Sequence, residues 1–182
     1  MDGSPANRTH VVQTELGPIA VETRGLGPTL VLWHSLFVNR RSFDGMIEAL
    51  ARDHRVVAID APDHGESRGP ADARRYDLDD CADAADEVLD ALGVERADWI
   101  GHAFGGHVGA VLAARRDGRL RSLVAIAAPM QPVDGRARLR ALMLLTRLVG
   151  VRGPVAAGLV DAMLAPDQRE DARVARLLAL AR

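Results

Sequence analysis

Lysine is absent from the sequence, and all 23 basic residues are arginines. This absence excludes Schiff-base chemistry, a phosphate-loop lysine and a lysine general base. Cysteine is almost absent too, because Cys81 is the only one, which rules out a disulfide within the chain and a cluster of thiolate metal ligands. A reducing environment suits such a chain, so we expect a cytoplasmic protein.

The sequence also lacks an excess of positive charge and a long apolar run. Its formal net charge is -2, which gives no basic field to hold nucleic acid or an anionic membrane surface. Residues 1–9 lack the pattern of an export signal, and Arg147 interrupts the richest apolar stretch, 139–151. We therefore expect no nucleic-acid partner, no export signal and no membrane span.

What the sequence does contain is enough apolar material for one domain. With 182 residues, 48% of them hydrophobic, the chain can bury one sizeable core. Strand-like apolar runs alternate with segments of helical spacing, which is typical of a mostly parallel sheet flanked by helices on both faces, the α/β fold class. The expected strands are two short segments around Gly17-Pro18, then 29–33, 54–61, 97–102 and 120–128, and the expected helices are 41–52, 77–92 and 104–116.

The character of the sequence changes after Met130. The segment 136–182 is rich in Leu, Ala and Arg and contains no strand-like run, which predicts helices near 136–149, 154–165 and 167–181. The chain is therefore expected to consist of a flexible N-terminus (1–9), an α/β core (10–130) and a C-terminal helical cap (131–182).

The strongest motif is Gly101-His102-Ala103-Phe104-Gly105-Gly106, at the junction of an expected strand and an expected helix. Glycines suit this place because so tight a turn leaves little room for larger side chains. The motif resembles the nucleophile elbow, G-x-S-x-G, of the α/β-hydrolase superfamily. Ala103 stands where that family has its serine, and alanine has no hydroxyl with which to attack a substrate.

Two further segments carry the resemblance, which extends from the first hairpin to Met130. His34-Ser35-Leu36 lies where the family has a loop that donates one oxyanion-hole amide, so the resemblance implies that the Leu36 and Phe104 amides form this hole. It also implies a pocket for a substrate, lined by His34, Ser35, Phe37, His102 and Met130. The run Asp63-His64-Gly65-Glu66-Ser67 is similar to the family's G-x-G-x-S turn, and we interpret it as structural.

The resemblance also indicates what is missing from a catalytic site. The family has its acid and its histidine after the nucleophile, in the order Ser, Asp or Glu, His. The six histidines of this sequence end at His107, so no general base follows the elbow. Asp134 matches an alternative position for the acid, although a solvated loop aspartate is the simpler interpretation. His34, His64 and His102 lack the spacing of a metal-ligand motif, and we expect no metal and no cofactor.

Three functions are compatible with these observations. The first is a hydrolase of an ester-type or similar small apolar substrate, inactive as given because Ala103 replaces the nucleophile and no late histidine is present. The second is a naturally non-catalytic, hydrolase-like protein that binds a small apolar ligand. The third is an interaction module whose Leu- and Arg-rich tail packs on a partner.

The expected strand 122–128 leads to a prediction about partners. In an α/β-hydrolase this strand is internal, whereas no later strand-like run is found here to pair with it. A Val-, Ile- and Leu-rich strand edge without protection invites pairing with another chain. We expect a missing C-terminal segment or, as the alternative, a second copy in a homodimer to cover this edge.

Overall fold

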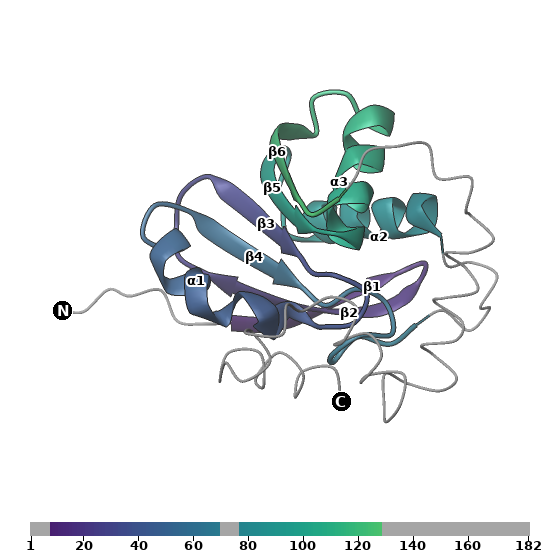
Figure 1. The fold of residues 1–182 in the computed structure, drawn as a ribbon, viewed down its shortest axis with the longest axis horizontal. Coiled ribbons are helices and arrows are strands. Elements are labelled where there is room, and N and C mark those ends of the chain that lie inside the picture. Colours follow the sequence, from purple (N-terminus) through teal and green to yellow (C-terminus); the bar gives the residue numbers. More distant parts are fainter. Residues whose placement is uncertain (1–7, 70–76, 129–182) are drawn as a thin grey trace, which may run out of the picture.

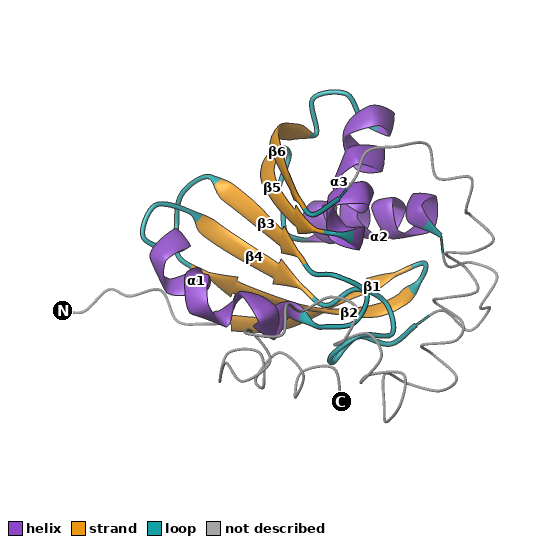
Figure 2. Ribbon diagram, viewed as in Figure 1, coloured by secondary structure: helices purple, strands orange, loops and turns teal. Residues whose placement is uncertain are grey.

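The computed structural model describes residues 8–69 and 77–128, which form one mixed sheet with helices on both faces (Figure 1). The strands are β1 (Arg8–Thr14), β2 (Gly17–Arg24), β3 (Thr29–Trp33), β4 (Arg55–Ile59), β5 (Ala97–His102) and β6 (Leu120–Ile126). Figure 2 shows the α-helices α1 (Asp44–Leu50), α2 (Leu78–Ala91) and α3 (Phe104–Arg115). The 3-10 helix η1 (Arg40–Phe43) directly precedes α1. The predicted α/β class is confirmed.

The order of strands in the sheet is β1-β2-β4-β3-β5-β6. β3 is parallel to β4 and β5, and β5 is parallel to β6, whereas β2 pairs antiparallel with both β1 and β4. Trp33, the last residue of β3, is the register partner of Ile59 in β4 and of Gly101 in β5. The loops after these three strands are therefore neighbours at the carboxyl edge of the sheet, where such folds have their reactive groups.

The alternation of side chains along the central strands divides the core into two layers. Val31 and Trp33 of β3 belong to a buried cluster that includes residues of α2 and α3. Leu30 and Leu32 belong to a second cluster, with Ile47 of α1. All five residues of β3 are buried, and this two-sided burial explains why its sequence is apolar without alternation.

Several expected elements end one or two residues from their bounds in the structure, and two segments differ in kind. β1 begins at Arg8, so Arg8 and Thr9 lie in the sheet, while the rest of the expected N-terminal segment is outside the described residues. The helix expected over 41–52 is a 3-10 turn followed by the shorter α1, because the Asn39 side chain accepts a hydrogen bond from the Arg41 amide and starts the turn earlier. The expected helical cap, 131–182, also lies outside the described residues.

Within the described part of the chain, no helix is both long enough and apolar enough to cross a membrane. The longest is α2, with 14 residues from Leu78 to Ala91. A span of the bilayer core needs about 20 apolar residues. α2 instead begins with a capping box, in which Asp77 and Asp80 bind each other's backbone amides, and such acidic groups stabilise the first turn of a helix.

β6 lies at one edge of the sheet that the described residues form, and most of its side chains are exposed. The exposed fraction is 50% for Val124 and 43% for Ile126. Its one charged residue, Arg121, is paired with Asp98 of β5 and so offers little protection to the edge. β1, at the other edge, has the sequence RTHVVQT and is mostly polar. The two edges therefore differ in their tendency to pair with another strand.

We propose that the β6 edge pairs with a further strand and that, in the isolated chain of 182 residues, this strand belongs to a second copy. Multi-angle light scattering should then give a mass above that of a monomer. Val124→Lys should shift the mass towards the monomer, because a charge on an edge strand opposes pairing. Val11→Lys, at an exposed position of the polar edge strand β1, is the matched control and should leave the mass unchanged. A monomeric, cooperatively melting parent chain would contradict this prediction.

Candidate active site

The elbow is a single-residue junction between β5 and α3, and Ala103 is that residue. Its backbone has φ 48° and ψ -105°, a positive φ that residues other than glycine rarely adopt. The Ala103 amide donates to the carbonyl of Ile126 over 2.7 Å, which ties the junction to the end of β6. The chain thus has the strained strand-to-helix turn that the motif predicts, although the side chain at its tip is a methyl group.

Close approaches of the backbone explain the glycines around this junction. A β-carbon at Gly101 would overlap the carbonyl of Gly105, and one at Gly105 would overlap the carbonyl of Trp33 in β3. The indole N–H of Trp99 donates to the Gly105 carbonyl over 3.0 Å. Trp99 is also stacked on Trp33, with ring centroids 5.6 Å apart. The start of α3 is therefore held against the middle of the sheet by contacts that only glycine permits.

The N-terminus of α3 gives the elbow its electrostatic character. Phe104 is the first residue of the helix, and amides of a first helical turn have no carbonyl acceptor within the helix. Such amides, together with the helix dipole, stabilise a negative charge near the start of the helix. The side chains of Phe104 and Leu36 belong to the same buried cluster. An oxyanion hole formed by the Leu36 and Phe104 amides stays a prediction.

His34, the first residue after β3, is completely buried and forms hydrogen bonds with both ring nitrogens. The Ala61 amide donates to its Nε2 over 2.9 Å, so the ring proton is on Nδ1, which donates to the Ser35 carbonyl over 2.6 Å. Burial, and next the charge of a protonated His64, lower the pKa of His34 to about 3. His34 therefore acts as a neutral link between the loops after β3 and β4.

His64 makes a second link between the same two loops. Its Nε2 donates to the carbonyl of Leu36, in the loop after β3, and its Nδ1 lies 2.8 Å from the carbonyl oxygen of Pro62. The His34 and His64 rings are tilted against each other, with centroids 5.1 Å apart. The loop that carries the expected oxyanion amide is thus fastened to its neighbour by two histidines.

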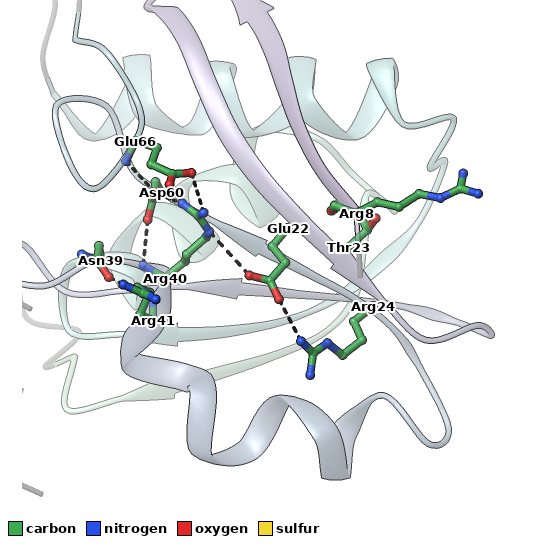
Figure 3. A network of polar contacts seen from close by, with 9 residues as sticks. All are labelled: Arg8, Glu22, Thr23, Arg24, Asn39, Arg40, Arg41, Asp60 and Glu66. Atoms are coloured by element: carbon green, nitrogen blue, oxygen red, sulfur yellow. Dashed lines mark hydrogen bonds and ion pairs between the residues drawn. The ribbon is translucent and has the colours of Figure 1, made fainter. Parts of the chain in front are cut away.

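An ion-pair network under these loops is centred on Asp60, which directly follows β4 (Figure 3). The Asp60 carboxylate is fully buried and accepts hydrogen bonds from the Arg40 amide at 2.8 Å and the Glu66 amide at 2.9 Å, besides an ion pair with the Arg40 guanidinium. Arg40 also binds Glu66 at 2.7 Å and lies 3.8 Å from Glu22 of β2. Each buried charge therefore has a partner, as burial of a charge requires.

The turn after β4 is held in place by hydrogen bonds and close packing, and its interpretation as purely structural stays a prediction. Asp63 stands in place of the family's first glycine and adopts a positive φ of 61°, a conformation that aspartate tolerates better than most residues. A β-carbon at Gly65 would overlap the Asp60 carboxylate. The Ser67 hydroxyl donates to the Asp60 carbonyl and accepts from the Ala20 amide, both at 2.8 Å. Ser67 is thus engaged in holding this turn against β2.

The structure brings most of the expected site residues to one edge. His34, Ser35, Leu36 and Phe37 follow β3, and His102 ends the neighbouring strand β5, directly before Ala103. Burial lowers the pKa of His102 as well. Met130 and Asp134 lie outside the described residues. In the described part of the chain, no three His, Cys, Asp or Glu side chains are placed so that they could hold a metal ion.

Asp60 and Arg40, whose ion pair joins the loops after β3 and β4, were not identified from the sequence. The available signal was an acidic residue at the end of the apolar run RVVAI, where a buried charge needs a partner. The identity of that partner, 20 positions earlier in the chain, follows from no local pattern.

A strained turn between a parallel strand and a helix is the arrangement of a hydrolase nucleophile elbow. The family described as alpha/beta hydrolase fold matches residues 28–165, and this chain belongs to that family.

Three known proteins show what the chain is similar to. A 2-hydroxymuconate semialdehyde hydrolase of Pseudomonas sp. (strain CF600) is 38% identical over 117 residues, which are 64% of this chain and 38% of that protein. The structure of the N-acyl homoserine lactonase AidH complexed with N-butanoyl homoserine has 33% identity and a TM-score of 0.63, covering 67% of this chain and 45% of that one. A hydrolase from Pseudomonas aeruginosa PA01 has 28% identity and a TM-score of 0.80 over 96% of this chain and 66% of that one. The chain thus spans less than half the length of the first two.

The low pKa of His34 predicts how stability depends on pH. The folded pKa is about 3 and the ordinary value is 6.5, so between these values the unfolded chain binds the additional proton. The free energy of unfolding should therefore fall by about 1.4 kcal/mol for each pH unit between about pH 6 and the folded pKa of about 3. Urea denaturation of the parent chain and of His34→Gln, which keeps a donor and an acceptor but does not titrate, should show a difference that shrinks as the pH decreases. His10→Gln is the control, and parallel curves for parent and His34→Gln would contradict the prediction.

The elbow predicts opposite effects for two small substitutions. Ala103→Gly should stabilise the chain by about 1 kcal/mol, because glycine adopts the positive φ without strain. Gly105→Ala should destabilise it by at least about 2 kcal/mol, because the new methyl group meets the Trp33 carbonyl. Urea denaturation measures both effects.

Each elbow substitution has a control of the same chemistry in a helix. Ala113→Gly, in α3, should cost about 1 kcal/mol, and Gly45→Ala, in α1 with open space around the new methyl group, should be neutral or stabilising. An Ala103→Gly variant as unstable as Ala113→Gly would show that the elbow is not strained.

Proposed function

We propose that this chain has the carbonyl-binding part of an ester-hydrolase site without its nucleophile. In the parent reaction a small apolar substrate with an ester-type bond is hydrolysed, and the present chain binds such a compound without cleaving it. The observation that supports this proposal is Ala103, which occupies the tip of an otherwise complete elbow. Its methyl group has no lone pair with which to form a covalent bond to a carbonyl carbon.

Within the 182 residues of this sequence, no histidine stands where the family has its general base. A serine nucleophile needs a histidine within hydrogen-bond reach, and the sequence has no histidine after His107. His34, close to the site, has both ring nitrogens bonded to backbone groups and a pKa of about 3, so it is a poor proton acceptor at neutral pH. His64 donates to Leu36 and is turned to the loop. Activation of water by these groups is therefore not part of the proposal.

Backbone amides are the groups that the site retains. The Phe104 amide at the start of α3, and in our proposal the Leu36 amide as well, polarise a carbonyl oxygen of the bound compound. This interaction does not depend on the side chain at position 103, because the donors belong to the main chain. The lactonase relative supports the choice of ligand, since a lactone is a cyclic ester and that structure is a complex with N-butanoyl homoserine.

A second candidate is a naturally non-catalytic ligand-binding protein. The observation that favours it is the strained backbone at Ala103, which persists although no nucleophile needs to be presented there. On this alternative the ligand site is the function of the protein in its own right. Both candidates predict binding of a small apolar carbonyl compound, and they differ in whether a related active form exists.

Esterase assays test the proposal. With p-nitrophenyl butyrate, the chain should show no burst of p-nitrophenol and no turnover beyond a weak residual rate from the amides alone. Ala103→Ser adds a hydroxyl but no base, so it should not restore activity in this chain. Ser35→Ala is the control for another nucleophile at the same edge. Turnover typical of an esterase that is lost in Ser35→Ala would show that the nucleophile is Ser35 and that the proposal is wrong.

A further inference from the structure

The loop after β3 has two consecutive peptide groups that are each held by a histidine. His34 Nδ1 donates to the Ser35 carbonyl, and His64 Nε2 donates to the Leu36 carbonyl. A peptide group is planar and trans, so its N–H points away from its C=O. The Ser35 carbonyl and the Leu36 amide share one peptide group, and the Leu36 carbonyl belongs to the next. The backbone on both sides of the Leu36 α-carbon is therefore fixed in direction.

The two histidines differ in how they depend on the core. His34 is fully buried and bonded to the Ala61 amide, so its removal would disturb the packing between β3 and β4. His64 is half-buried and lies in the turn after β4. Its own backbone is fixed separately, because its amide donates to the Ala61 carbonyl over 3.0 Å and its carbonyl accepts from the Ser67 amide over 2.9 Å. The ring of His64 is thus a hydrogen-bond donor on a fixed backbone, and its acceptor lies in the neighbouring loop after β3.

We infer that His64 is a positioning residue for the loop that carries the Leu36 amide, because it holds the peptide group between Leu36 and Phe37 next to the one that His34 holds. The turn after β4 then takes part in binding a carbonyl compound and is not only structural. The inference rests on the proposed function, because it gives the Leu36 amide the role of a donor to the ligand. Without the hydrogen bond from His64 Nε2, the peptide group between Leu36 and Phe37, which carries the Phe37 amide, loses its restraint. The Leu36 amide is then held from one side only, through the bond from His34 to the Ser35 carbonyl, and the loop that carries it is less well ordered. His64 itself need not touch the ligand.

Two variants of His64 separate positioning from packing. His64→Leu keeps the volume of the side chain but has no donor, whereas His64→Gln keeps an N–H donor at a similar reach. In the ¹⁵N-labelled chain without ligand, His64→Leu should shift and broaden the amide resonances of Leu36 and Phe37, and His64→Gln should return them towards the parent positions. His10→Leu is the control, because His10 bonds to Thr23 in the β1–β2 pair and lies in another part of the sheet.

Binding of N-butanoyl homoserine lactone, followed by calorimetry, gives the second readout. We expect His64→Leu to weaken binding about tenfold, because ordering the loosened loop on binding costs about as much as one hydrogen bond contributes, and His64→Gln to stay within about threefold of the parent. Unchanged affinity and unchanged Leu36 and Phe37 resonances in His64→Leu would overturn the inference while leaving the proposed function in place. If the parent chain does not bind the lactone but the loop resonances still move, positioning of the loop is supported and the proposed binding function fails.

A measurement on the parent chain makes the inference independent of variants that fold poorly. The His64 Nε2 proton should be visible in a long-range ¹H–¹⁵N spectrum and protected from exchange with water, because it is held by the Leu36 carbonyl. A rapidly exchanging proton on that nitrogen would overturn the inference, whatever the stability of His64→Leu.

Discussion

The buried carboxylate of Asp60 is the interaction on which the carboxyl edge of the sheet depends. It has no exposed surface, and an unpaired charge in such a place would be very costly. Its partners come from both neighbouring loops: the amide and guanidinium of Arg40 at the start of η1, and the amide of Glu66 in the turn after β4. Because Gly65 has no β-carbon, the turn can fold directly over the carboxylate. One buried charge thus fixes the relative position of two loops, and His34 and His64, which link these loops, lie on them.

The elbow depends on a different kind of constraint, namely close contact of uncharged groups, supported by the hydrogen bonds of the Ala103 amide and the Trp99 indole. Gly105 touches the backbone of β3, and the stacked pair of Trp33 and Trp99 fills the space below the start of α3. These contacts impose the positive φ on Ala103, since the residue has no room to relax while β5 and α3 stay packed. The strain at the elbow is therefore a consequence of packing. It does not require a nucleophile, which is why an alanine is found in a conformation that is usually associated with glycine.

Some parts of this arrangement could be predicted from the sequence and others could not, for physical reasons. The run 29–33 is apolar on both faces of an extended chain and so predicted a strand that is covered on both sides. Leu30 and Val31 do belong to the two different core clusters on opposite faces of the sheet. The spacing of Gly101 and Gly105 predicted the elbow, because the steric requirement for glycine at these two positions is visible in the local sequence. The order of strands and the pairing of Asp60 with Arg40 correspond to no local sequence pattern, since they join segments that are distant in the chain. The first helix was predicted as one α-helix over 41–52, whereas the Asn39 cap starts a 3-10 turn at Arg40 and the α-helix itself covers Asp44–Leu50.

Binding and cleavage have separate physical origins at this edge. The groups that would polarise a carbonyl oxygen are backbone amides, and their directions are fixed by helix α3, by the histidine links and by the Asp60 network. The group that would break the bond is one side chain at position 103 together with a base. Alanine retains the β-carbon of serine and lacks only its oxygen, so it fits the elbow without new contacts or a cavity. Position 103 is therefore the place where the chemistry of the family can be removed while the fold and the amide donors remain, and any ligand affinity of this chain should be insensitive to that oxygen.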